Sequence, residues 1–146
     1  MGDISKDIQS TFPSERVKAY INIKYTANWL SSQENEFFKT FGISPQQFNI
    51  LRILRGAGKA IKVQEIKDRM IERAPNATRL MDKLCAKNMI ERIRCPEDRR
   101  VVHIAIIDNG LKLLKEIDTI GEKRNILDKL TEEEAKQLSD LLDKVR

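Results

Sequence analysis

Amide and cationic side chains recur on one side of a predicted helix over residues 75–87. Asn76, Arg79 and Lys83 are three and four positions apart, so a helix brings them to one face. Another face follows the spacing of a buried apolar stripe, formed by Ala77, Leu80, Met81 and Leu84. An amide and two cations suit a groove of duplex DNA, where such groups bond base edges or phosphates. The pattern therefore indicates a groove-reading helix, and the alternative is a solvated basic surface.

The segments beside this helix predict a helix-turn-helix followed by a hairpin. Residues 64–70 have the pattern of a short helix, and residues 71–73 connect it to the second helix. Residues 89–95 and 100–107 are predicted strands, joined by a charged tip at residues 96–99. Residues 60–62 are too few to stand alone as a strand, but they can pair with the hairpin as a third strand. A helix-turn-helix with such a wing places its second helix in a major groove, while basic residues elsewhere bind phosphates.

Start signals predict the helices on either side of this segment. Ser44, Pro45 and Gln47 combine an N-cap, a proline at the first helical position and a capping box. Further N-caps are predicted at Ser14, Asp108 and Thr131. Residues 1–12 show no useful periodicity and are expected to fray.

The predicted helix after Ser14 has an apolar band that is wider than a surface helix of a small monomer needs. The band contains Val17, Tyr20, Ile21, Ile23, Ala27 and Leu30, with Tyr25 and Trp29 on its flank. The predicted helices after residues 108 and 131 are amphipathic as well. Because such helices flank a basic middle segment, we expect a homodimer in which the ends associate and two copies of the middle face DNA.

The positive charge of the chain is concentrated in this middle segment. Residues 55–100 contain 13 Lys and Arg residues against 7 Asp and Glu residues. The corresponding counts are 6 and 5 for residues 1–54, and 8 and 10 for residues 101–146, in a chain of net charge +5. The excess lies where the pattern predicts a DNA-reading element, as neutralisation of phosphates requires.

The sequence contains few of the residues that metal binding, redox chemistry or catalysis needs. Cys85, Cys95 and His103 are the only cysteines and the only histidine, so the chain alone cannot form a four-ligand zinc site of these residues. We expect reduced thiols, with a redox sensor as the alternative, and a surface role for His103. The sequence has no Gly-rich phosphate loop and no recognisable pair of nucleophile and base. We therefore expect no enzyme, no cofactor and no bound metal.

Composition and length predict a cytoplasmic chain of about one domain. Charged residues make up 34% of the 146 residues, and the mean hydropathy is −0.48. No apolar run approaches the ~20 residues that cross a bilayer. The first residues lack the basic and then apolar order of a signal peptide. We expect no association with a membrane.

The sequence resembles the MarR family, the multiple-antibiotic-resistance type of bacterial winged-helix regulator. The resemblance is carried by Ile-Ser-Pro-Gln-Gln-Phe-Asn-Ile-Leu at 43–51, Thr-Arg-Leu-Met-Asp-Lys-Leu at 78–84, Lys-Asn-Met-Ile at 87–90 and Pro-Glu-Asp-Arg-Arg at 96–100. Asp108-Asn109-Gly110 stands where members usually have Thr-x-x-Gly, and residues 130–134 match the start of the last family helix. The order and spacing of these motifs match from residue 14 to the end of the chain.

The resemblance implies a mainly α fold with a small β-hairpin wing, which is an α+β winged helix-turn-helix. It implies one MarR-like domain over residues 1–146, with dimerisation helices at 14–41 and 108–146 and a winged-helix DNA-binding lobe at 44–107. Members are homodimers that bind pseudo-palindromic operators, so double-stranded DNA is the implied partner. Many relatives bind small phenolic or other aromatic anions between the two lobes. Tyr25, Trp29, Phe37 and Phe38 are the aromatic candidates for such an effector site, and core packing is the alternative.

The resemblance also assigns DNA contacts to single residues. It implies that Asn76, Thr78 and Arg79 enter the major groove, with Arg73 and Lys83 near phosphates or groove edges. Asparagine and arginine near a helix start suit this role, because each can bond a base edge through two hydrogen bonds.

On the wing, the resemblance implies that Arg100 reaches into a minor groove, with Asp98 as its orienting carboxylate and Arg99 as a phosphate contact. Lys62 stands where a capping Thr or Ser is common, so the helix after it is expected to lack that cap. We expect a ligand-responsive repressor that binds its operator as a homodimer. The alternative is a winged-helix protein-interaction module whose basic face meets an acidic protein.

Overall fold

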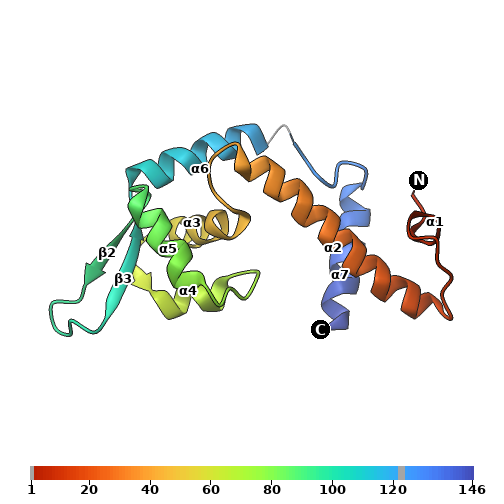
Figure 1. Cartoon of the computed structure of the whole chain (residues 1–146), viewed down its shortest axis with the longest axis horizontal. Coiled ribbons are helices and arrows are strands. Elements are labelled where there is room, and N and C mark those ends of the chain that lie inside the picture. Colours follow the sequence, from red (N-terminus) through yellow and green to blue (C-terminus); the bar gives the residue numbers. More distant parts are fainter. Residues whose placement is uncertain (1, 122–123) are drawn as a thin grey trace.

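The computed structural model describes residues 2–121 and 124–146. A compact lobe contains α3 (Pro45–Ala57), β1 (Ile61–Lys62), α4 (Val63–Arg69), α5 (Ala77–Ala86), β2 (Ile90–Arg94) and β3 (Val102–Ile106) (Figure 1). From this lobe, α2 (Glu15–Lys39) and α6 (Asp108–Gly121) lead to an extended part that holds α1 (Ile4–Asp7) and α7 (Glu132–Val145). The molecule is therefore elongated, with a mainly α composition and a small sheet.

The predicted caps at Ser14, Ser44 and Thr131 start their helices, and the one predicted at Asp108 is wrong. The Ser44 hydroxyl accepts from the Gln47 N–H at 3.1 Å, and the Gln47 side chain accepts from the Ser44 N–H at 2.9 Å. Thr131 and Glu134 form the same reciprocal pair at the start of α7. Ser14 caps α2, whereas α6 begins at Asp108 itself rather than after it. Lys62 makes no side-chain bond to α4, as predicted.

The small sheet has the strand order β1-β3-β2 and is antiparallel throughout. Ile61 lies opposite Ile104, so the short segment before α4 is the third strand that the sequence predicted. In the hairpin, Arg92 lies opposite Ile104 and Arg94 opposite Val102. Asn88 has a φ of 55°, a left-handed conformation that asparagine tolerates, and it turns the chain from α5 into β2. Helix α5 and the β2–β3 hairpin are thus joined by a tight turn.

The core of the compact lobe lies around α3, which contacts α2, α4, α5, α6 and β3. Its fully buried side chains come from every element of the lobe and from α6, and they include Ile50, Leu51, Leu54, Ile66, Met81, Leu84, Ile104 and Leu114. Because α6 contributes Leu114 to the core, it fixes the compact lobe to the extended part.

The extended part has little core of its own. Tyr20 on α2 is 58% exposed, and Leu141 and Val145 on α7 are 63% and 73% exposed. The segment before α2, expected to fray, instead forms the short helix α1, because the Asp3 carboxylate caps it by accepting from the Ser5 N–H at 3.0 Å. Asp3 also pairs with Lys18 at 3.3 Å, which ties α1 to α2.

Candidate nucleic-acid interface

Helix α5 presents its polar face because its apolar face is held by the core. Ala77, Met81 and Leu84 are buried, and Thr78, Arg79 and Lys83 are exposed. The Gln47 amide of α3 donates to the Leu80 carbonyl at 3.4 Å, which adds a polar contact between α3 and α5. The amphipathic pattern of α5 therefore decides which side chains face outward.

Asn76 occupies the N-cap position of α5, yet its side chain makes no capping hydrogen bond. Its φ of −98° and ψ of 22° are not the extended values typical of a side-chain cap. The exposed amide is therefore available to a ligand at the N-terminal end of the helix, beside Thr78 and Arg79. Arg73, in the connection before α5, is exposed as well.

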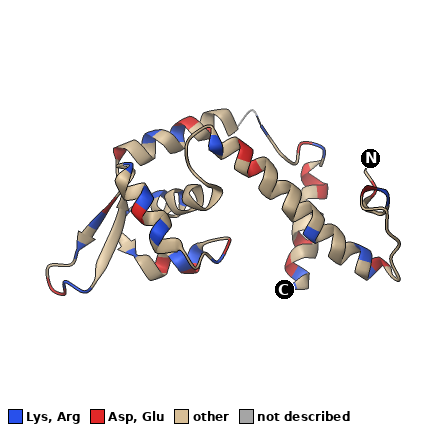
Figure 2. Ribbon diagram, viewed as in Figure 1, with Lys and Arg blue, Asp and Glu red and all other residues tan. Residues whose placement is uncertain are grey.

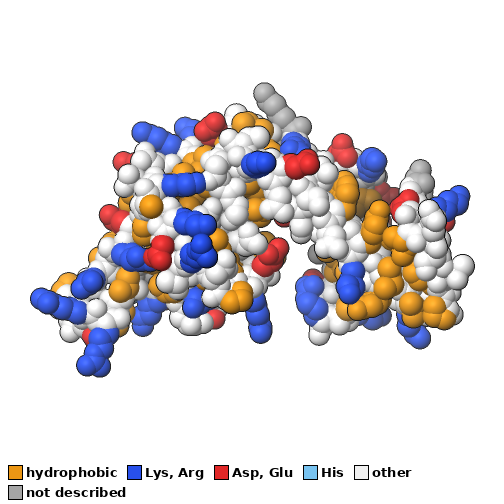
Figure 3. Space-filling view, viewed as in Figure 1, with side chains coloured by type: hydrophobic (Ala, Val, Ile, Leu, Met, Phe, Trp, Pro, Cys, Tyr) orange, Lys and Arg blue, Asp and Glu red, His pale blue; other side chains and the backbone are white. Residues whose placement is uncertain are grey.

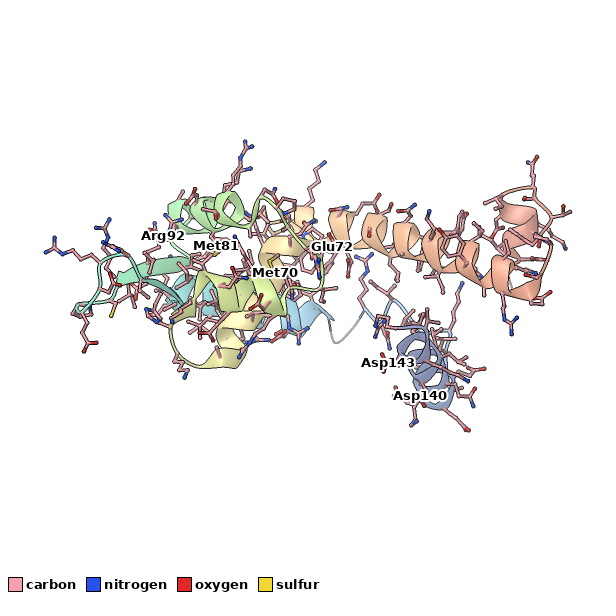
Figure 4. All side chains as sticks on the ribbon, turned by 90° about the horizontal axis from the view of Figure 1, so that it is seen from below. Met70, Glu72, Met81, Arg92, Asp140 and Asp143 are labelled. Carbon is pink, nitrogen blue, oxygen red and sulfur yellow. The ribbon has the colours of Figure 1, made fainter. Side chains whose placement is uncertain are left out.

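An ion pair between Asp82 and Arg92 joins α5 to the wing. Hydrogen bonding to Asp82 raises the pKa of the Arg92 guanidinium. Figure 4 labels Arg92 on the strand that lies beside α5. Sequence reasoning missed this pair, because Arg92 lies on an edge strand and its partner lies on another element.

The tip of the wing is ordered by backbone contacts of Asp98. Its carboxylate accepts from the Arg100 N–H at 3.0 Å, and its carbonyl accepts from the Val101 N–H at 3.0 Å. The carboxylate thus shapes the tip through the backbone of Arg100, and the described ion pairs include none between Asp98 and the Arg100 guanidinium. Arg99 and Arg100 are both exposed, and Figure 3 shows basic side chains projecting from the end of the wing.

The cations predicted to contact DNA have no acidic partners in the described part of the chain. The ion pairs found within 4.0 Å involve none of Arg73, Arg79, Lys83, Arg99 and Arg100. Figure 2 shows basic residues along α5 and at the wing, so both elements present positive charge. Cations that form no ion pair with a carboxylate are free to neutralise phosphates.

The two cysteines lie in different surroundings. Burial raises the pKa of the Cys85 thiol on α5. At the base of the wing tip, the backbone N–H groups of Asp98 and then of Glu97 lower the pKa of the Cys95 thiol. Both are free thiols, and residues 2–121 and 124–146 contain no group of three or more potential metal ligands.

Two hollows lie where α2 meets the compact lobe. The junction hollow, about 470 Å³, is lined by α2, α3 and the α4–α5 connection, and its residues include Glu34, Phe38, Phe48, Ile53, Ile71 and Glu72. The second hollow, about 660 Å³, lies toward α6 and shares Glu34, Phe38 and Phe48 with the first.

The structure divides the four aromatic residues predicted to bind an effector. Phe38 lines both hollows and Phe37 lines the second, with their ring centroids 5.1 Å apart. Tyr25 and Trp29 line neither hollow and lie exposed on α2. Both lie nearer the N-terminal end of α2 than Phe37 and Phe38 do, and therefore away from the junction with the compact lobe.

None of the described helices is both long enough and apolar enough to cross a membrane.

Comparison with known proteins identifies the fold. The model of the MarR family matches residues 43–102, from just before α3 to the first residue of β3. The HTH-type transcriptional repressor MdtR of Bacillus subtilis is 33% identical, over 99% of this chain and 84% of the repressor.

Solved structures agree over most of the chain. A MarR transcription factor from Planctomyces limnophilus is 35% identical with a TM-score of 0.70, over 91% of this chain and 98% of that one. A cysteine-to-serine mutant of MarR from E. coli, solved in complex with operator DNA, is 26% identical with a TM-score of 0.71, over 99% of both chains. On the match to MdtR, reinforced by these structures, the chain belongs to the MarR family of winged helix-turn-helix transcriptional regulators.

Proposed function

We propose that this chain is a ligand-responsive repressor that binds a pseudo-palindromic operator as a homodimer. The observation that carries the proposal is the set of exposed cations on α5 and the wing that have no carboxylate partners in the described residues. Such a surface suits DNA, because phosphates provide the negative charge that these unpaired cations can neutralise. The MdtR relative is named a repressor, and a MarR relative binds operator DNA. Such a regulator would act in the cytoplasm.

The roles of the residues follow from where they lie. Asn76, Thr78 and Arg79 stand at the first turn of α5 and would read base edges in the major groove. Arg73, just before the helix, and Lys83, one turn farther along it, would contact phosphates or groove edges.

The wing would contribute minor-groove and phosphate contacts. Arg100 would enter the minor groove, where arginine reads the width of the groove, and Arg99 would bind a phosphate. Asp98 supports both by ordering the backbone of the tip. Removal of the Asp98 carboxylate would therefore loosen both arginines at once.

A dimer places two such surfaces on one duplex. We assign residues 14–41 and 108–146 to dimerisation and residues 44–107 to DNA binding, because the exposed apolar side chains gather on α2 and α7. Two recognition helices that read one face of DNA must lie about 34 Å apart. A ligand that binds a different lobe spacing more tightly would shift the population away from this arrangement and release the operator.

Selection of bound fragments from random duplexes tests this proposal. A twofold symmetric consensus, with half-sites one helical turn apart, is the expected result. Duplex binding without any consensus would contradict sequence-specific regulation. A selection that recovers nothing above a control without protein would favour the alternative, a protein-interaction module whose basic face binds an acidic protein.

A further inference from the structure

Strand β2 leaves the hydrophobic core after its first residue. The strand lies at one edge of the sheet and contacts β3 and α5. Ile90, its first residue, is buried, whereas the four residues that follow are exposed. Past Ile90, the ion pair of Arg92 with Asp82 connects the strand to α5. The wing is therefore held to the helix at two points, one apolar and one charged.

Arg92 occupies the core-facing side of β2. Side chains two residues apart on a strand share a face, so Arg92 lies on the same side as the buried Ile90. It also lies opposite Ile104, which is fully buried. The long side chain of Arg92 extends from this row to the surface, where its guanidinium meets the Asp82 carboxylate. The ion pair thus continues the row of core contacts toward the outer part of the wing.

Asp82 is an acidic residue on the exposed, basic side of α5. It follows Arg79 by three residues and directly precedes Lys83, and all three side chains are exposed. A carboxylate at this place repels the phosphates of an approaching duplex. Arg92 neutralises it, and hydrogen bonding to Asp82 raises the pKa of the Arg92 guanidinium. The pair therefore joins the two elements without adding net charge to the surface that faces DNA.

The tip of the wing lies beyond this ion pair. The carboxylate and the carbonyl of Asp98 accept hydrogen bonds within the tip, so they order the tip itself. At the other end of β2, the turn at Asn88 joins the strand to α5. A rotation about this turn would move the distant tip, which carries Arg100, more than the base of the strand. The contact made by Arg92 lies between the two ends and opposes such a rotation.

From this geometry, we propose that the Asp82–Arg92 ion pair positions the wing for operator recognition, so that Arg100 reaches the minor groove while Arg79 reads the major groove. The inference rests on the proposed function. Asp82 and Arg92 are positioning residues, because they act through the placement of Arg100 rather than through a base contact of their own.

Replacement of Asp82 by asparagine separates positioning from charge, because the two effects have opposite signs. Loss of a negative charge alone would tighten binding to every duplex. Loss of the wing position should instead weaken binding to the selected operator by about fivefold. Fluorescence anisotropy with operator and scrambled duplexes measures the change. An Asp82→Asn variant that binds the operator as tightly as the wild type, or more tightly, would overturn the inference.

Glu91→Gln is the matched control, because it removes one negative charge from the residue next to Arg92. Glu91 is exposed, and the ion pairs found among residues 2–121 and 124–146 do not include it. This variant should bind both duplexes at least as tightly as the wild type. Asp82→Glu keeps the carboxylate and should bind the operator more tightly than Asp82→Asn does. If Glu91→Gln weakens operator binding as much as Asp82→Asn, the effect does not come from the ion pair and the inference fails.

A double-mutant cycle tests whether the ion pair acts through Arg100. Arg100→Ala should weaken operator binding about tenfold in the wild type, but only about twofold in Asp82→Asn or in Arg92→Gln. Arg79→Ala should weaken it by the same factor in all three backgrounds, because α5 keeps its place on the core. An effect of Arg100→Ala that is equal in all three backgrounds would contradict the positioning role.

A measurement without DNA separates this inference from the proposed function. Backbone NMR relaxation of the free protein reports the fast motion of single amides. Order parameters of residues 95–101 should fall in Asp82→Asn and stay at wild-type values in Glu91→Gln. An exposed ion pair contributes little to stability, so the thermal midpoints should remain close to that of the wild type.

The two proposals can then fail separately. If the wild type binds no duplex, the proposed function fails, while the relaxation data still decide whether the ion pair holds the wing. If the order parameters of the wing in Asp82→Asn equal those of the wild type, the ion pair does not hold the wing and the inference is wrong.

Discussion

At the scale of single residues, Arg79 and Lys83 occupy one exposed face of α5 but lie one turn apart. Arg79 is in the first turn, where side chains reach base edges, and its guanidinium can bond one guanine twice. Lys83 lies farther along the helix and carries a point charge that suits a phosphate. The loss of affinity on removing Arg79 should therefore depend on the DNA sequence, and the loss on removing Lys83 should depend on the salt concentration.

We expect Arg79→Ala to weaken binding to the selected operator by ~1–3 kcal/mol and to relax the consensus at one base pair. Lys83→Ala should weaken binding to every duplex and reduce the salt slope by about 1. Anisotropy titrations on operator and scrambled duplexes at four salt concentrations measure both effects. Equal operator affinity for Arg79→Ala and wild type would remove the base-reading role.

Glu34 provides a prediction about stability and pH. Its pKa is raised in the folded protein by burial and then by Glu72, so the folded state binds a proton more readily than the unfolded state. This carboxyl therefore costs stability once the pH rises above its ordinary value, and the full cost is present above the raised value. Arg52, Asp118 and Arg124 are the other charged residues around it.

Glu34→Gln should thus raise the denaturation midpoint at neutral pH. The gain should vanish below pH 4.5, the ordinary pKa of a glutamate, because the carboxyl is then protonated in both states. Urea denaturation of both proteins across this pH range provides the measurement. A gain that stays constant across the range would show that packing, rather than ionisation, causes the difference in stability between the two proteins.

Residue roles that depend on local sequence were predictable, and those that depend on a loop or on distance were not. Ser44 and Gln47 form the predicted capping box, because the motif spans a single turn. Asp98 was expected to orient the side chain of Arg100, but only the folded tip shows that it accepts from the backbone N–H. Tyr25 was grouped with Phe37 by residue type, which says nothing about distance along a helix.

At the scale of elements, the contact between α6 and the start of β2 depends on a glycine. A Cβ at Gly110 would lie 2.5 Å from the Met89 carbonyl oxygen and 2.7 Å from Cγ1 of Ile106. The Met89 carbonyl also accepts from the Ile107 N–H at 3.1 Å, so it cannot move away without the loss of that bond. The first turn of α6 is thus packed directly on the backbone that joins α5 to the wing.

We expect Gly110→Ala to destabilise the protein by about 1–3 kcal/mol, because the added methyl group must displace backbone. Gly56→Ala is the matched comparison, since a Cβ there meets nothing within 4 Å and Gly56 lies within α3. That substitution should stabilise by roughly 0.5–1 kcal/mol, as alanine is the better helix former. Thermal denaturation measures both, and similar stability of the two variants would contradict the close contact.

The elements themselves were largely predictable because each has a local signal. The 25-residue length of α2, the third strand at Ile61 and the two capping boxes all follow from patterns within a few turns. The ion pair of Asp82 with Arg92 did not follow, because it joins different elements whose relative rotation only the packed core defines. The same reason explains why the junction hollow was not predicted.

At the scale of the whole molecule, the extended part leaves apolar surface exposed on two elements. Tyr20, Ile23 and Trp29 on α2, and Leu138, Leu141 and Val145 on α7, are all exposed in the single chain. Figure 3 shows hydrophobic side chains gathered at this end of the molecule. On the polar face of α7, Asp140 and Asp143, labelled in Figure 4, pair with Lys136 and Arg146 of the same chain. These two carboxylates therefore need no partner from a second copy. A second copy that covers the apolar side would complete the extended part.

Leu141→Glu should therefore prevent dimerisation, since each dimer would bury two unpaired carboxylates. We expect the dimer dissociation constant to rise by at least about a hundredfold, and operator affinity to fall with it because each protomer then reads one half-site. Light scattering after gel filtration, at protein concentrations from nanomolar to micromolar, measures the first effect. Lys136→Glu puts the same side chain on the polar face of α7 and should leave the dimer intact. A wild type that stays monomeric at every concentration would contradict the proposed dimer, and a Leu141→Glu variant that dimerises as the wild type does would place the interface elsewhere on the molecule.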